Sequence, residues 1–204
     1  MYNIITISRQ FGSGGRSIAK SVAEELGYAY YDKELIKEVA EKTGFDPRYI
    51  EEAGEYAKSR SIFSYALPFT GSGHGAVGAG GMSTSDFLWV MQRKVILELA
   101  EKGPCVIVGR CADYILRERT DALHVFVHAD EAFRADRIVR LYGESEKSPE
   151  ARLKDKDGRR AVNYKYYTGR EWGKAEFYDL SINSGKLGIE NCVSVIAGFA
   201  KHNG

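Results

Sequence analysis

Residues 4–17 read Ile4-Ile5-Thr6-Ile7-Ser8-Arg9-Gln10-Phe11-Gly12-Ser13-Gly14-Gly15-Arg16-Ser17 and carry the strongest structural signal in the chain. An apolar, β-branched run, typical of a buried strand, ends at a cluster of glycines, and an amphipathic helix follows at once. Glycines at this point let successive backbone N–H groups turn toward one anion at the positive end of the helix. The pattern is close to the phosphate-binding loop G-x-x-x-x-G-K-[ST], but its lysine is absent.

The composition excludes several classes of protein. The chain has 204 residues, of which 29 are basic and 28 acidic, so the formal net charge is only +1. This length suits one domain, and the balanced charge gives no field that favours nucleic acid or a membrane surface. Three scattered cysteines favour a reducing compartment without a disulfide framework. The chain begins with no leader pattern and contains no run of about 18 apolar residues, so we expect a cytoplasmic protein. The sequence leaves the oligomeric state open.

Predicted strands and helices alternate along the chain. Strands are expected at residues 4–8, 28–31, 105–108, 123–127 and 180–183. Helices are expected at residues 18–26, 32–43, 85–102, 130–142 and 189–200, with further helices starting near residues 46 and 148. Ser85 or Asp86, Asp130 and Ser148 are the expected caps of three of these helices. The alternation predicts an α/β domain with a parallel, doubly wound sheet whose ligands bind at the carboxyl ends of the strands.

Periodicity disappears between residues 59 and 84. Within this stretch, residues 71–81 are mostly glycine, alanine and serine and have almost no side chain to pack, so we expect them to be mobile. A surface loop is favoured over a lid that orders over a substrate.

Four polar clusters follow predicted strands. The glycine loop favours nucleotide phosphate over an ordinary turn or a dinucleotide site, because its glycines do not match G-x-G-x-x-G. Asp32, after the second strand, is a simple helix cap when considered alone. Arg110 is either a surface residue or a bidentate phosphate ligand, with the two interpretations nearly even. The fourth cluster, residues 134–170, mixes arginines, lysines, carboxylates and tyrosines. It fits a solvated helix or a cationic hairpin over a polyphosphate, with nucleic-acid binding a poor third.

Together these pieces resemble the cytidylate kinase-like family of nucleoside monophosphate kinases. Residues 9–20 and 23–27 resemble the loop and first helix of that family, and Tyr31-Asp32 and Val108-Gly109-Arg110 resemble its acceptor motifs. Asp157-Gly158-Arg159-Arg160 fits its lid pattern Asp-x-x-Arg, and residues 180–184 resemble the strand that ends near the adenine pocket. The resemblance implies a three-layer P-loop kinase fold with a helical lid. It describes one domain over residues 1–204, with an acceptor-binding insertion at about 32–85 and a lid at about 143–175.

The sequence departs from that family at four positions. Gly15 stands where the family has the loop lysine, and Arg9 stands where it has the first glycine. Cys111 replaces an acidic residue, and Glu38 stands in place of an acceptor arginine, although Lys37 is adjacent. We therefore expect an arginine to replace the missing lysine, and favour Arg16 over Arg9 because Arg16 lies in the first turn of the helix.

The resemblance implies ATP-dependent phosphoryl transfer, with ATP and Mg²⁺ as cofactors and a nucleoside monophosphate such as CMP or dCMP as acceptor. The expected ATP-binding residues are Arg9, Gly12, Ser13, Gly14, Gly15, Arg16 and Ser17, and Ser17 would also bind Mg²⁺. The expected acceptor-binding residues are Asp32, Lys37, Arg110, Asp157 and Arg160. The expected catalytic cations are Arg16, Arg152, Lys156, Arg159 and Arg160.

Two other functions remain open at this point. One is a nucleotide-binding sensor with little or no transfer activity, favoured by Gly15, Cys111 and Glu38. The other is a kinase of a small non-nucleotide acceptor, since the acceptor motifs depart most from the family.

Overall fold

The computed structural model describes residues 1–55 and 83–202. Within them, five parallel strands form one sheet in the order β2-β3-β1-β4-β5. The strands are β1 (Ile4–Arg9), β2 (Ala29–Tyr31), β3 (Cys105–Val108), β4 (Ala122–His128) and β5 (Leu180–Asn183). The predicted parallel, doubly wound α/β sheet is therefore confirmed. Strand β1 is central and pairs with β3 on one side and β4 on the other.

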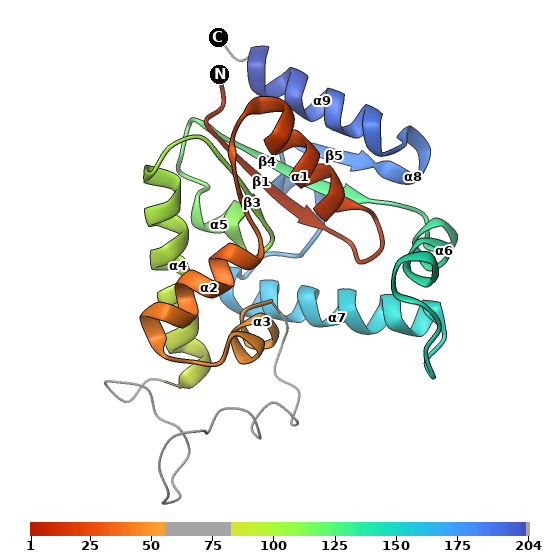
Figure 1. Cartoon of the computed structure of the whole chain (residues 1–204), viewed down its shortest axis with the longest axis horizontal. Coiled ribbons are helices and arrows are strands. Elements are labelled where there is room, and N and C mark those ends of the chain that lie inside the picture. Colours follow the sequence, from red (N-terminus) through yellow and green to blue (C-terminus); the bar gives the residue numbers. More distant parts are fainter. Residues whose placement is uncertain (56–82, 203–204) are drawn as a thin grey trace, which may run out of the picture.

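Helices cover both faces of this sheet (Figure 1). The longer helices are α1 (Gly15–Leu26), α2 (Lys33–Thr43), α3 (Pro47–Glu55), α4 (Thr84–Glu101), α6 (Glu131–Tyr142), α7 (Pro149–Thr168) and α9 (Ile189–His202). Short helical turns are α5 (Ala112–Ile115), η2 (Ala175–Phe177) and α8 (Ser184–Leu187). None of the described helices is long and apolar enough to cross a membrane.

The alternation of side chains along the buried strands divides the core into two layers. Ile5 and Ile7 of β1 pack in the layer formed with α1 and α9. Ile4 faces the other way, into the layer formed with α2, α3 and α4. All six residues of β1 are buried, as expected for a strand covered on both faces. Helices α6 and α7 lie apart from these layers, beyond the carboxyl ends of the strands (Figure 1).

The helix ends show where cap prediction works and where it does not. Ser148 caps α7 by accepting a hydrogen bond from the N–H of Ala151, and Asp130 is the N-cap residue of α6, as predicted. The predicted cap of α4 is wrong, because the N-cap is Ser83, which accepts from the N–H of Asp86. Ser83 follows a stretch without periodicity, so the pattern gave no earlier helix start. The segment 71–81, expected to be a loop or lid, lies outside the described residues.

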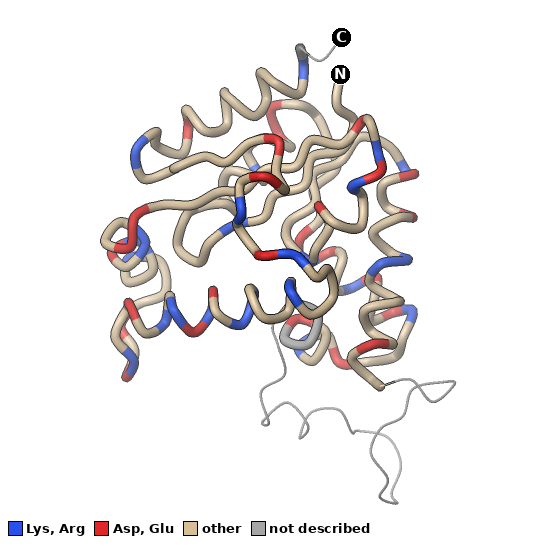
Figure 2. The backbone as a smooth tube through the Cα atoms, turned by 180° about the vertical axis from the view of Figure 1, so that it is seen from behind, with Lys and Arg blue, Asp and Glu red and all other residues tan. Residues whose placement is uncertain are grey.

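The segment predicted as a lid contains α7. Basic and acidic residues alternate along this helix, as Figure 2 shows from behind. Its buried residues nevertheless include Arg160, Asn163 and Tyr164, which face the carboxyl end of the sheet. Helix α7 is therefore charged on its outside and packed against the domain on its inside. No disulfide joins the buried Cys105, Cys111 and Cys192.

Candidate functional site

The glycine loop joins β1 to α1 and has the backbone of an anion cradle. Gly12 and Gly14 both adopt left-handed conformations, with φ of 80° and 82°. A Cβ on Gly12 would lie 2.8 Å from the carbonyl oxygen of Arg134, and one on Gly14 would lie 2.5 Å from Cδ1 of Ile189. Only glycine fits either position. Gly14 is the N-cap of α1, so the first-turn N–H groups of that helix, which have no partner within it, open at this loop.

A buried hydroxyl network holds the loop from below. Ser184, at the end of β5, is fully buried and donates from Oγ to the carbonyl of Ser13 at 2.6 Å. Ser13 in turn donates from Oγ to the carbonyl of Gln10 at 2.9 Å. Residues 180–184, which resemble the family's strand near the adenine pocket, thus support the backbone of the glycine loop through Ser184. Sequence reasoning missed this role of Ser184, because a serine after a strand carries no specific signal.

Arg9 explains why the lysine is absent from the loop. This residue ends β1 and is only 4% exposed. A Cβ on Gly15 would lie 2.4 Å from Cβ of Arg9, so no side chain fits at residue 15 while Arg9 is present. At the other end, Nη1 of Arg9 lies 1.9 Å from where a Cβ on Gly109 would be. Arg9 is packed between two glycines, and the arginine at residue 9 and the glycine at residue 15 are sterically coupled.

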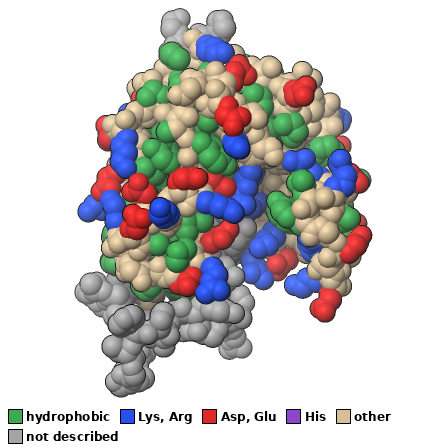
Figure 3. Space-filling model, in the orientation of Figure 1, with side chains coloured by type: hydrophobic (Ala, Val, Ile, Leu, Met, Phe, Trp, Pro, Cys, Tyr) green, Lys and Arg blue, Asp and Glu red, His purple; other side chains and the backbone are tan. Residues whose placement is uncertain are grey.

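A cavity of about 270 Å³ opens beside the loop. Its described lining is strongly basic: it includes Arg9, Arg16, Arg137, Lys156 and Arg160, against one described carboxylate residue, Glu51. Figure 3 shows Lys and Arg side chains gathering in the hollow on this face. The remaining lining is the glycine loop itself together with an apolar wall of Phe11, Leu141 and Tyr142.

The apolar wall includes an aromatic pair from two segments. The rings of Phe11 and Tyr142 lie nearly parallel, at 14°, with centroids 5.9 Å apart. Tyr142 is 57% exposed and Leu141 56% exposed, so the wall presents apolar surface beside the cationic loop. Such a combination suits a ligand with an anionic group and a flat ring.

Arg16, the predicted substitute for the lysine, contacts Asp32. Its Nε lies 3.0 Å from Oδ2 of Asp32, and the Asp32 side chain is only 11% exposed. Asp32 is the N-cap residue of α2, but its side chain makes no capping hydrogen bond to the helix. Its carboxylate faces the guanidinium instead. The structure therefore brings together two predicted site residues, one from the expected ATP side and one from the expected acceptor side.

Asp157 links α7 to the loop. Its Oδ1 accepts a hydrogen bond from the N–H of Phe11 at 2.7 Å, and its Oδ2 lies 2.6 Å from Nη1 of Arg134. Arg160 approaches the same carboxylate at 3.5 Å. Burial raises the pKa of Asp157, although the Phe11 amide and the two arginines oppose that shift. Arg134, which sequence reasoning did not assign to the site, also donates to the carbonyls of Phe11 and Ala129.

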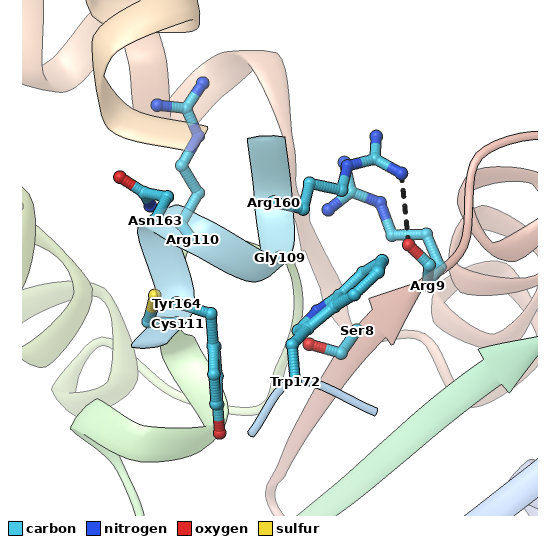
Figure 4. A pocket seen from close by; sticks show the side chains of 9 residues that line it. All are labelled: Ser8, Arg9, Gly109, Arg110, Cys111, Arg160, Asn163, Tyr164 and Trp172. Carbon is cyan, nitrogen blue, oxygen red and sulfur yellow. Dashed lines mark hydrogen bonds between the residues drawn. The ribbon is translucent and has the colours of Figure 1, made fainter. Parts of the chain in front are cut away.

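A smaller pocket of about 20 Å³ lies next to the cavity, at the carboxyl ends of β1 and β3 (Figure 4). Arg160 and Arg9 lie side by side in it, and Nη1 of Arg160 donates to the carbonyl of Arg9 at 3.1 Å. Ser8, Asn163, Tyr164 and Trp172 complete much of the wall. Two adjacent guanidinium groups make this pocket suited to a phosphate oxygen.

Arg110 lines the same pocket but its guanidinium points away from Arg9 and Arg160 (Figure 4). Its Nη1 donates to the carbonyl of Ile50 at 2.9 Å and to Oε1 of Gln92 at 3.2 Å. The backbone causes this direction, because Gly109, Arg110 and Cys111 have successive φ values of 66°, 60° and 54°. Left-handed residues other than glycine are uncommon, and here they turn Arg110 toward α3.

A buried carboxyl joins this left-handed turn to α7. The hydroxyl of Tyr164 donates to Oδ2 of Asp113 at 2.6 Å, and both side chains are buried. Burial raises the pKa of Asp113 to about 6, the hydrogen bond from Tyr164 opposing the shift. Burial likewise raises the pKa of Tyr164. The contact holds the inner face of α7 at a fixed place relative to β3.

Three other predicted cations make their contacts outside the glycine loop. Arg152 donates to the carbonyl of Gly143 at 2.8 Å, and Arg159 pairs with Asp155 of its own helix at 3.2 Å. Lys37 is 79% exposed on α2, 4.0 Å from Glu41. Lys156 and Arg160 are the predicted lid cations that line the cavity. Among the described residues, no group of three or more His, Cys, Asp or Glu side chains could hold a metal ion.

Arg137 is a cavity residue that the sequence analysis did not assign. It comes from α6, and its Nη2 donates to Oγ of Ser17 at 3.0 Å. Its Nε lies 3.5 Å from the Cβ position of Gly14. The run of arginines at 134, 137 and 140 is visible in the sequence, but helical spacing alone does not say which of them faces the loop.

Comparisons with known proteins find relatives that match nearly the whole chain. The chain is 28% identical over 196 residues to a cytidylate kinase from Archaeoglobus fulgidus, a match covering 94% of this chain and 91% of that protein. A cytidylate kinase from Pyrococcus horikoshii is 22% identical over 200 residues, covering 98% and 88%. Among solved structures, an uncharacterized protein from Eubacterium ventriosum superposes with a TM-score of 0.71 at 26% identity, covering 98% and 99%.

More distant structures share the fold. A gluconokinase from Sinorhizobium meliloti has a TM-score of 0.55 at 16% identity, covering 97% of this chain and 93% of that one. A shikimate kinase from Acinetobacter baumannii has a TM-score of 0.53 at 16% identity, covering 96% and 91%. The family model described as the cytidylate kinase-like family matches residues 4–186. The chain has the fold of the P-loop kinases and belongs to the cytidylate kinase-like family.

Proposed function

We propose that this protein transfers the γ-phosphoryl group of ATP to a nucleoside monophosphate, with CMP and dCMP the first acceptors to test. The observation that carries the proposal is the left-handed glycine loop at the start of α1, opening into a cavity lined by five cationic side chains. Membership of the cytidylate kinase-like family supports the reaction class. The names of the curated relatives support the choice of acceptor.

The loop side of the cavity suits the donor. The N–H groups of the loop and of the first turn of α1 would bind the phosphates of ATP, and the wall of Phe11, Leu141 and Tyr142 would take apolar parts of the nucleotide. A unit charge about 4 Å from a phosphate oxygen contributes about 4 kcal/mol at an effective dielectric constant near 20. Several cations around one polyphosphate therefore replace much of its hydration.

The small pocket, of about 20 Å³, would take one oxygen of the acceptor phosphate, and the rest of that group would lie in the adjoining cavity. Arg9 and Arg160 lie together there, next to the cavity that would hold the donor. In the step, an oxygen of the acceptor phosphate forms a bond to the γ-phosphorus, the bond from that phosphorus to the β–γ bridging oxygen breaks, and ADP leaves. Such a reaction needs aligned reactants and neutralised charge more than covalent catalysis. The arginines of this pocket would supply both.

Mg²⁺ would neutralise charge on the phosphates of the donor. The hydroxyl of Ser17, exposed in the first turn of α1, accepts a hydrogen bond from Arg137 and would bind Mg²⁺ through a bridging water, or directly after Arg137 turns to the phosphates, since Mg²⁺ commonly keeps several waters. Asp32 lies nearby through its pair with Arg16 and would hold that arginine in place.

A nucleotide sensor without transfer activity is the second candidate. One observation favours it: the predicted substitute for the lysine, Arg16, is engaged by Asp32 at 3.0 Å, so its charge is partly neutralised. Both functions require nucleotide binding, and they differ only in turnover.

The test is a panel of nucleoside monophosphates with ATP and Mg²⁺, scored by chromatographic detection of the nucleoside diphosphate. We expect product with at least one pyrimidine nucleotide, and none after Mg²⁺ is chelated. R160Q should lose most of the activity, whereas K165Q, which changes an exposed residue of the same helix, should keep it. Tight ATP binding with no product from any nucleoside monophosphate would refute the nucleoside monophosphate kinase, and would leave the sensor and a kinase of a small non-nucleotide acceptor as the two remaining functions.

A further inference from the structure

We propose that Arg137 of α6 supplies the positive charge that the glycine loop itself lacks at residue 15, and binds the β- and γ-phosphates of the donor nucleotide. The inference rests on the proposed function for its ligand, but it concerns a residue outside the loop. The cation then comes from α6, a helix that packs against the loop, and not from the loop sequence.

The contacts of Arg137 place its charge over the loop. Nη2 donates to Oγ of Ser17 at 3.0 Å, so the guanidinium reaches the first turn of α1. Nε and Cζ lie 3.5 and 3.6 Å from the Cβ position of Gly14. The guanidinium therefore lies where a phosphate seated on the N-terminus of α1 would contact it.

Helix α6 is held rigidly against the loop, which fixes the position of Arg137. A Cβ on Gly12 would lie 2.8 Å from the carbonyl of Arg134 and 3.0 Å from Cγ2 of Ile138. Arg134 is buried and is held by Asp157 and by the Phe11 carbonyl. Residues on both sides of Arg137 thus contact the loop and fix the backbone that carries this arginine. Binding of a phosphate therefore costs little conformational entropy.

The two arginines near the loop in sequence are directed elsewhere. Arg16 points to Asp32 at the end of β2, at 3.0 Å. Arg9 is 4% exposed and runs beneath the loop to Gly109. Arg137 is partly exposed and lines the cavity with the loop glycines. Its planar fork of donors suits bidentate contact with phosphate oxygens.

The experiment measures binding as well as turnover, in the full-length chain. Titration calorimetry with inorganic tripolyphosphate, ATP and AMP is run on wild type, R137A and R137K. The matched control is R140A, because Arg140 lies on the same helix, is exposed and pairs with Asp136 at 2.8 Å. Thermal melting of each variant checks that it is folded.

We expect R137A to weaken binding of tripolyphosphate and ATP by about 10- to 100-fold, the range expected for charge-assisted hydrogen bonds. Binding of AMP should change by less than about threefold, and R137K should fall between R137A and wild type. R140A should bind as wild type does. Added guanidinium ion should restore part of the tripolyphosphate affinity of R137A.

Unchanged tripolyphosphate binding in folded R137A would overturn the assignment, and so would an equal loss in R140A. Either result leaves the proposed kinase standing, because wild-type product formation tests that function separately. Conversely, a wild type that forms no diphosphate product refutes the kinase. A selective loss of tripolyphosphate binding in R137A would still assign the cation to α6.

Discussion

Replacing Gly15 with alanine should destabilise the protein, even though alanine normally favours a helix. The new Cβ would lie 2.4 Å from Cβ of Arg9 and 2.9 Å from its Cγ, whereas carbon atoms in contact prefer about 3.5–4.0 Å. Both residues are on rigid elements, since β1 is paired on each side and Gly15 is buried at the start of α1. More than 1 Å of separation must therefore be found by moving a strand or a helix.

The expected cost follows from this geometry. Overpacking a buried site costs about 3 kcal/mol at the upper end of the usual range, and the helix preference of alanine returns at most about 1 kcal/mol. The net loss in the free energy of unfolding is about 2 kcal/mol. For a chain of this length that loss lowers Tm by about 4–8 °C.

Urea and thermal unfolding of G15A measure this loss, and G158A is the matched control. Gly158 lies within α7, and a Cβ there would meet nothing within 4 Å, so alanine should stabilise by about 1 kcal/mol. In an R9G background, which removes the opposing Cβ, G15A should be neutral or stabilise by up to about 1 kcal/mol, giving a coupling energy of about 2–3 kcal/mol. Equal stability of G15A and wild type, or the same loss in both backgrounds, would refute the steric argument.

Three further predictions concern single side chains. Because burial raises the pKa of Asp113 to about 6, the folded state keeps a proton that the unfolded chain releases, so this carboxyl reduces stability as the pH rises from about 4 to 6. In urea unfolding, the difference in free energy of unfolding between D113N and wild type should increase in favour of D113N by up to about 3 kcal/mol from pH 4 to pH 6. A difference that stays constant with pH would contradict this. D157A leaves the buried Arg134 without its carboxylate and should lower the free energy of unfolding by about 3 kcal/mol, with D157N milder; equal melting curves would contradict it. The W89F variant leaves Trp172, which lines the small pocket, as the single tryptophan of the chain. Its fluorescence emission should therefore change when W89F is titrated with nucleotide. An unchanged spectrum at saturation would show that the pocket is not part of the site.

Local sequence patterns were sufficient to predict most of the fold. The strands are short, mostly apolar runs, and those other than β1 have a glycine, proline or aspartate next to at least one end. Their alternation with helices indicates a parallel sheet. The short turns α5 and α8 were not predicted, because four residues cannot establish a helical period. The cap of α4 was placed two or three residues late, at Ser85 or Asp86, for a similar reason, since nothing periodic precedes it.

The site was harder to predict, because side-chain direction depends on contacts between distant segments. The glycine loop was recognisable, but nothing in the sequence indicated that the guanidinium of Arg110 contacts the carbonyl of Ile50. Asp32 looked like a cap and faces Arg16. Arg137 looked like one of three equivalent arginines, and the packing of α6 on Gly12 fixed which one places its guanidinium at the first turn of α1.

The hydrogen bond from the Phe11 amide to Asp157 makes one backbone proton a reporter of helix motion. Within the glycine loop, this N–H is held by a carboxylate that belongs to α7, 146 residues away in the chain. Solvent deuterium can replace it only when α7 moves away from the loop, so its exchange rate measures how often that separation occurs. A polyphosphate that draws Arg160 toward itself acts on the same helix. Exchange at this single amide can therefore follow movement of α7, the helix within the segment predicted as a lid, without any label on that helix.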